Sequence, residues 1–200
     1  MKTQDTYRQL GREYLRGGKR GVLLAFADFA AVLVESTASV ADIERLRQRV
    51  GADLWLKKSL VEQRLAALRD STQAALRLGR HAEAEATARL ILTELSGENK
   101  NLHPPAEEAA AHALLALAVA RQSRGAEALT VVDPALRIYR DLRAKDADGV
   151  DFRQDFAFAL YVQAMARADD ADGRAQRRAA LDEAATLLDG LSDEAKQLHD

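Results

Sequence analysis

One pattern occurs three times in this chain, and it limits the folds open to it: a short turn is followed by a helix-forming segment rich in small residues. The three segments read HAEAEATARLIL, AEALTVVDPALRIY and ALDEAATLLDGL. Each has an alanine at the first close-packing point of the returning helix, and small or apolar residues follow four and seven positions later. These sets are Ala84, Ala88 and Ile91; Ala128, Val132 and Ala135; and Ala184, Leu188 and Leu191. Such spacing places the residues on one helix face, so the chain is predicted to repeat antiparallel helix pairs.

The composition agrees with a purely helical chain. Alanine, leucine, arginine and glutamate dominate, and all four favour helices. Val, Ile and Thr rarely alternate as they do in strands, and only 5% of the residues are aromatic. We therefore predict an all-α fold in which antiparallel helical hairpins stack on one another.

Turn signals divide the chain into pairs of helices within one predicted domain, residues 1–200. Gly17-Gly18, Gly79 and Pro104-Pro105 mark helix ends or starts. The predicted pairs cover about 3–36, 53–96, 104–145 and 151–190, with an extra helix at about 40–50. The last two breaks fall at KDADG and DDADG, and the final helix is predicted from about Arg174 to Leu188.

The N-terminal segment YRQLGREY carries the most specific motif. Tyr7, Leu10, Gly11 and Tyr14 are followed by a turn and by VLLAFADFA. This arrangement resembles the tetratricopeptide repeat (TPR), as does ALRLGRHAEAEATARLIL further along the chain. The resemblance implies a right-handed superhelix in which Gly11 lies where two helices touch and the aromatic side chains fill holes between neighbouring helices.

The chain departs from the simplest TPR in its spacing. Ala84, Ala128 and Ala184 are 44 and 56 residues apart, whereas the simplest TPR repeats every ~34 residues. The second to fourth pairs also lack the aromatic-Leu-Gly core of the first. The resemblance is therefore to TPR proteins with extended helices.

Charge, cysteine content and hydropathy bound the class of protein. The 29 basic and 31 acidic residues are interspersed, which disfavours a nucleic-acid-binding protein. There is no cysteine, which rules out disulfides, thiolate metal sites and a cysteine nucleophile. The most apolar run, Val22–Val34, is too short to span a bilayer and contains Asp28. We interpret it as a buried helix rather than a signal sequence, and we expect a cytoplasmic protein without a membrane span.

Three short motifs invite chemical interpretations, and each has a simpler one. GGKRG lacks the strand and the spacing of a phosphate-binding loop, and is predicted to be a turn. His103, Glu108 and His112 could contribute to a zinc site, but Glu107 and Glu108 also suit the start of a helix. DDADG does not complete a calcium-binding loop. We therefore predict no metal, no cofactor and no catalytic residues.

The candidate site comes from the TPR resemblance, which implies that the first helix of each pair lines a concave face. On this chain that face would carry Arg8, Arg12 and Arg16 from the first pair, and Arg69, Gln73 and Arg77 from the second. Each row is spaced by four residues, as expected for one helical stripe. The alternative is an ordinary solvated face.

The predicted function is that of a scaffold or adaptor that binds a partner polypeptide through an acidic segment that pairs with the arginines. A regulatory or ligand-sensing domain of a larger signalling or transcription system is the alternative. An enzyme is the least supported class, because no catalytic constellation stands out.

Overall fold

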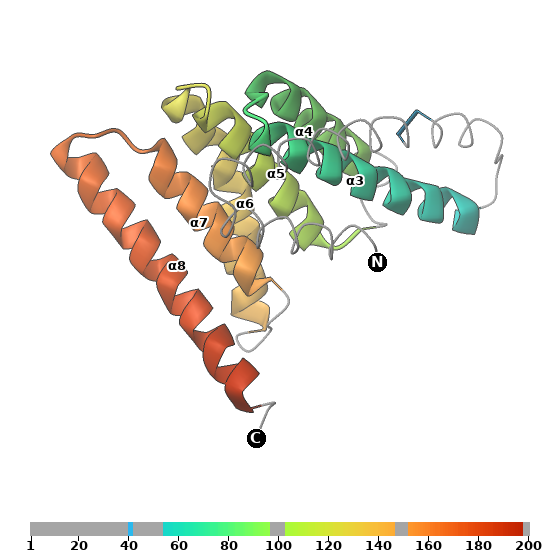
Figure 1. The fold of residues 1–200 in the computed structure, drawn as a ribbon. Helices are drawn as coiled ribbons and strands as arrows, with labels where there is room; N and C mark the ends of the chain where they lie inside the picture. Colours follow the sequence, from blue (N-terminus) through green and yellow to red (C-terminus); the bar gives the residue numbers. More distant parts are fainter. Residues whose placement is uncertain (1–39, 42–53, 97–102, 147–151, 198–200) are drawn as a thin grey trace, which may run out of the picture. The chain divides into compact units, whose positions relative to one another are not determined.

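The computed structural model describes residues 40–41, 54–96, 103–146 and 152–197, with the backbone alone for 54–60 and 190–197. All regular secondary structure in these ranges is helical, which confirms the all-α prediction. The helices are α3 (Leu54–Arg77), α4 (His81–Leu95), α5 (Pro105–Ala120), α6 (Gly125–Lys145), α7 (Arg153–Ala166) and α8 (Ala171–Gln197) (Figure 1). The pair predicted at 3–36 lies outside the described residues, as does the extra helix except for Val40 and Ala41, which are helical.

The chain divides into two compact units, Met1–Thr87 and Ala88–Asp200. In the described part of the first unit, α3 buries one face, formed by Val61, Leu65, Leu68, Thr72 and Ala75. Thr72 is the polar member of this row, and its hydroxyl donates to the carbonyl of Leu68 at 2.8 Å. A buried hydroxyl satisfied within its own helix can be included in an apolar face.

The second unit is built around α7. This helix packs against α5, α6 and α8, while α5 also packs against α6. Two antiparallel hairpins, α5–α6 and α7–α8, therefore follow one another along the chain and share one core (Figure 1).

Small residues set the spacing of this core. Five of the eight buried residues of α5 are alanine, and α8 contributes Ala180 and Ala184. At the start of α6, a Cβ on Gly125 would lie 2.6 Å from the carbonyl oxygen of Ala166. Glycine is therefore needed where the start of α6 meets the end of α7.

Tyr139 of α6 is the largest fully buried side chain of the described residues. Its ring stacks on Phe152 and Phe156, with centroids 6.4 and 5.6 Å away. Its hydroxyl donates to the carbonyl of Ala106 on α5 at 3.4 Å. Burial raises the pKa of Tyr139, so the hydroxyl stays protonated as this hydrogen bond requires. One side chain thus joins α5, α6 and the start of α7.

The turns after α3 and α5 have the same backbone structure. Gly79 and Ser123 have positive φ angles of 74° and 62°. The next amide donates to a carbonyl five residues earlier in both turns, from Arg80 to Ala75 at 2.8 Å and from Arg124 to Val119 at 3.4 Å. A second bond runs from Gly79 to Leu76 and from Ser123 to Ala120. These are Schellman motifs, and they recur 44 residues apart.

The buried stripes of α4, α6 and α8 repeat in register. Ala84, Ala88 and Ile91 are buried on α4, and Ala128, Val132 and Ala135 on α6, as predicted. On α8 the inward stripe is Gly173, Arg177, Ala180, Ala184 and Leu187, of which Arg177 is half-buried. Gly173 is thus the equivalent of Ala128, which makes the spacing 45 residues.

The predicted spacing of 56 residues, with Ala184 at the first packing point, is therefore wrong. The structure differs from the prediction at two residues of this hairpin. Asp170 accepts a hydrogen bond from the Gly173 amide at 2.6 Å, so it caps the helix start, and α8 begins at Ala171 instead of Arg174. Leu188 was predicted to face inward, but it is 46% exposed and its neighbour Leu187 is buried instead.

None of the helices within the described ranges is both long enough and apolar enough to cross a membrane.

Candidate functional site

The part of the predicted arginine site that the structure describes lies on α3. Arg69, Gln73 and Arg77 follow one another at four-residue spacing, with Arg69 half-buried and the other two exposed. Arg8, Arg12 and Arg16 lie outside the described residues, so the predicted match between the two rows stays a prediction.

The row on α3 is not one straight face. Four residues advance a helix by about 400°, so each step turns the side chain by about 40°. Val61 and Leu65 precede the row at the same spacing and are buried, Arg69 is half-buried, and Gln73 and Arg77 are exposed. The row therefore winds from the core into solvent, and its exposed part is its C-terminal end.

Arg69 has a carboxylate beside it. Burial raises the pKa of Asp70, and the charge of Arg69 opposes this rise. Part of the positive charge of Arg69 is thus balanced within α3. Arg77 lies in the last turn of α3, where a cation is favoured by the helix dipole.

His103, which precedes α5, and His112 within the helix form separate contacts. His103 is almost fully buried, and its Nδ1 lies 3.4 Å from the Oε2 of Glu107 rather than beside Glu108. His112 forms a hydrogen bond with the backbone of Val131 on α6, and burial lowers its pKa while Glu108 raises it. In the described ranges, no group of three His, Cys, Asp or Glu residues could hold a metal ion.

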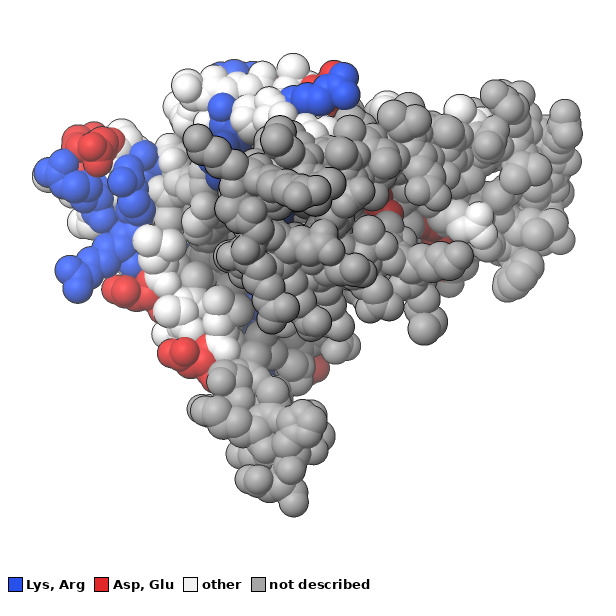
Figure 2. Space-filling model, in the orientation of Figure 1, with Lys and Arg blue, Asp and Glu red and all other residues white. Residues whose placement is uncertain are grey.

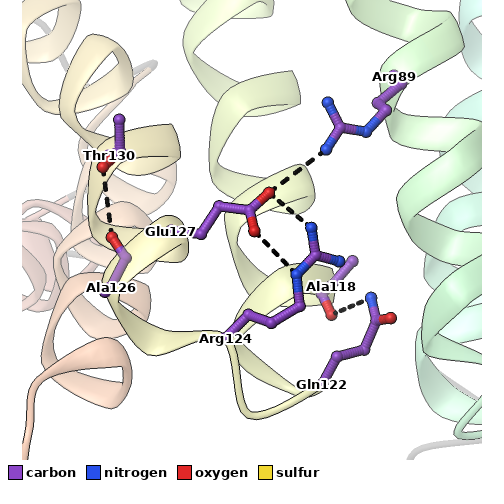
Figure 3. Close-up of polar contacts among 7 residues, drawn as sticks. All are labelled: Arg89, Ala118, Gln122, Arg124, Ala126, Glu127 and Thr130. Atoms are coloured by element: carbon purple, nitrogen blue, oxygen red, sulfur yellow. Dashed lines mark hydrogen bonds and ion pairs between the residues drawn. The ribbon is translucent and has the colours of Figure 1, made fainter.

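A polar cluster that the sequence interpretation missed joins α4 to the α5–α6 turn (Figure 3). Arg124 donates to both carboxylate oxygens of Glu127, at 2.8 and 2.6 Å. Arg89 of α4 approaches the same carboxylate at 3.6 Å. Exposed ion pairs contribute only ~0–1 kcal/mol each, so this cluster orients the turn more than it stabilises the fold.

The signal for this cluster was present in the sequence as Arg-x-x-Glu-Ala. It occurs at Arg80–Ala84 and at Arg124–Ala128. Arg80 and Glu83 pair at 2.5 Å in the first copy, as Arg124 and Glu127 do in the second. In the third hairpin the corresponding residues are Asp169 and Asp172, so the pair is lost there.

The start of α8 carries a different polar arrangement. Arg177 donates to the carbonyl of Arg167 at 3.1 Å, and Arg174 donates to that of Asp169 at 2.7 Å. Both cations therefore cap the C-terminal end of α7 and the turn after it. Figure 2 shows basic side chains over the first part of α8, with uncharged and acidic side chains further along the helix.

The outer side of α8 also exposes large apolar residues, which the sequence interpretation did not anticipate. Leu181 is 41% and Leu188 is 46% exposed. Ala185 lies between them and is exposed as well. Because these residues are spaced by four and three, they lie on one face of the helix.

No protein family model, no curated protein sequence and no solved structure matches this chain.

Proposed function

We propose that this chain is a scaffold or adaptor that binds a partner polypeptide, built from TPR-like helical hairpins stacked as a right-handed superhelix. The observation that carries the proposal is the recurrence of one hairpin design. The Schellman turns at Gly79 and Ser123 are 44 residues apart, and the inward stripes of α4, α6 and α8 repeat every 44 to 45 residues. Stacked repeats of this kind present extended surfaces and carry no intrinsic chemistry.

The packing order of the second unit is a further support. In it, α7 is the first helix of its hairpin and contacts both helices of the hairpin before it. Within this unit the second hairpin therefore packs on the first, as in a repeat array. The absence of cysteine fits a reducing compartment, and we propose a cytoplasmic location.

The proposed binding residues are Arg8, Arg12, Arg16, Arg69, Gln73 and Arg77. An arginine fork offers parallel donors to a carboxylate, which suits an acidic segment of a partner. Because exposed charge pairs are weak individually, the arginines must act together. Gln73 and Arg77 form the exposed part of the row that the structure describes.

The test uses the full chain as bait for a stoichiometric partner, followed by affinity measurements on charge reversals. Arg8→Glu with Arg12→Glu, and separately Arg69→Glu with Arg77→Glu, should each weaken binding by about tenfold or more, equivalent to ~1.4 kcal/mol. Added salt should weaken binding of the unsubstituted chain. Arg143→Glu on α6 is the matched control, since Arg143 is also exposed.

Circular dichroism must show unchanged helix content in every variant. If the partner binds both double reversals as tightly as the unsubstituted chain, the arginine rows are not the binding site. If no partner is retained at fixed stoichiometry, the scaffold function itself is contradicted.

A further inference from the structure

The outer face of α8 is an apolar surface with charged edges. Leu181, Ala185 and Leu188 form the apolar row, and the two leucines keep 41% and 46% of their surface exposed. Asp182 and Asp189 each follow a leucine of this row, so they lie along one edge of it, and both are exposed. Arg178 extends the same row toward the N-terminal end of α8.

The repeat register shows what kind of element suits the Leu181 end of this face. Leu181 is 45 residues after Leu136, the same offset that relates the inward stripes of α6 and α8. Leu136 is 1% exposed and belongs to the buried cluster that contains Phe156 and Leu160 of α7. In the earlier hairpin, this position is therefore covered by the helix that follows.

Among the described residues, α8 packs against α7 and no helix occupies the place that α7 takes beside α6. At the end of the outer face that Leu181 forms, a helix is thus the natural occupant. Ala185 and Leu188 correspond to Arg140 and Arg143 of α6, which are exposed, so the apolar row of α8 extends beyond the surface that α7 covers on α6. A helix buries such a row when its own apolar residues recur at spacings of three and four.

A second copy of α8 fits this face poorly. If two copies paired antiparallel about Ala185, Asp182 of one would lie near Asp189 of the other. If they paired in parallel, Arg178 would face Arg178. Both arrangements bring like charges together, which disfavours them. A helix with Lys or Arg along one edge would instead pair with Asp182 and Asp189.

We propose that the outer face of α8 binds an amphipathic helix of a partner polypeptide, whose apolar face covers Leu181, Ala185 and Leu188 and whose basic edge meets Asp182 and Asp189. This inference rests on the proposed scaffold function and specifies one kind of partner segment for it. Because Arg178 and Asp182 pair at 4.0 Å and are largely exposed, a basic partner residue competes with only a weak internal contact.

The probe is a stapled amphipathic peptide of three heptads, with Leu and Ala on one face and Lys along one edge. Its counterpart carries Glu in place of every Lys. Binding to the full-length chain is followed by fluorescence anisotropy. We expect the Lys peptide to bind at least about tenfold more tightly than the Glu peptide. Asp182→Lys with Asp189→Lys should reverse this preference.

Leu181→Ser with Leu188→Ser should weaken binding of the Lys peptide by about tenfold or more. Leu90→Ser is the matched control, since Leu90 of α4 is 48% exposed and lies outside the proposed surface. All these side chains are exposed, so the melting temperature should change little. Absence of binding by the Lys peptide, or binding that survives the double serine substitution, overturns the proposal.

Light scattering tests whether a second copy of the chain, rather than a partner helix, covers the outer face of α8. A dimer that becomes monomeric in the double serine variant would identify a second copy on α8 and overturn the proposal of a partner helix. The scaffold function is tested separately: a captured partner whose affinity is unchanged by the serine substitutions refutes the α8 surface alone. Failure to capture any partner refutes the scaffold.

Discussion

The hairpins α5–α6 and α7–α8 place their residues in the same register but fill the positions differently. Along the inward stripe, α6 has Val132, Ala135 and Tyr139 where α8 has Arg177, Ala180 and Ala184. The buried members of both stripes belong to one cluster, to which α7 contributes the larger side chains Phe156 and Leu160. A shared hairpin geometry therefore does not need the same residues, provided that the facing helix fills the space.

The turns of the two hairpins differ as well. The α5–α6 turn relies on a left-handed Ser123, whereas the α7–α8 turn relies on the Asp170 cap and on arginines that bind the end of α7. Four residues connect the helices in both cases. The length of the turn thus preserves the register while its chemistry varies.

The largest loss of stability is expected on substitution of Tyr139, which occupies the position of Ala184 in the other hairpin. Replacing Tyr139 with alanine, the residue found at the equivalent Ala184, should destabilise the protein by about 3–5 kcal/mol, because it leaves a cavity beside Phe152 and Phe156. Chemical denaturation measures this change. Tyr139→Phe removes only the hydroxyl that bonds to Ala106, and should cost about 0.5–1.5 kcal/mol. Equal losses for the two variants would show that Tyr139 does not fill the core.

A smaller effect of opposite sign is expected at the turns. Ser123→Gly should stabilise the protein by up to about 1 kcal/mol, because glycine adopts a positive φ without the clash that Ser123 incurs. Gly79→Ser should destabilise it, since Gly79 has the equivalent conformation. Ala168→Gly in the third turn is the control and should destabilise slightly, because Ala168 does not have a positive φ. Thermal unfolding under identical buffer conditions decides the signs.

The Gly79 turn could be predicted from the sequence, and the turn at Asp170 could not. Glycine after a helical segment has one common use, as the left-handed residue that ends a helix. Aspartate followed by glycine suits both a turn and a helix cap, so DDADG gave the wrong start for α8. Adjacent apolar residues are similarly ambiguous: Leu187 and Leu188 differ by about 100° on the helix, and the packing of α7 decides which one is buried.

The helix that carries part of the candidate site could be predicted from the sequence, but the exposure of its residues could not. Arg69, Gln73 and Arg77 lie on one helix, α3, as predicted, but their burial depends on how the core lies against that helix. The exposed leucines of α8 could not be recognised from periodicity, because an apolar residue has the same spacing whether a neighbour covers it or not.

The smallest expected effect is on the pH dependence of the stability of the α5–α6 hairpin. Burial lowers the pKa of His112 in the α5–α6 hairpin, where Glu108 and Arg137 are the nearby charges. As the pH falls below the ordinary histidine value of about 6.5, the unfolded chain binds more protons than the folded one, so stability decreases. The described residues of α7–α8 include no histidine.

Hydrogen exchange at pH 7 and pH 5.5 should therefore show faster opening of α5 and α6 than of α7 and α8 at the lower pH. His112→Gln should remove part of this difference. Equal acceleration in both hairpins, or no change in the variant, would contradict the role given to His112.

The alanine-rich face of α5 has a consequence for the entropy of folding. Alanine has no rotamers to lose on burial, whereas a buried leucine loses about 0.5–1 kcal/mol of side-chain conformational entropy at room temperature. A face formed by Ala109, Ala113 and Ala116 therefore becomes ordered without freezing side-chain motion, and only the backbone has to be fixed. Alanine also favours the helix before any packing occurs. Helix α5 thus gains less from burial than a leucine-rich helix would, but it also gives up less freedom to reach its folded state.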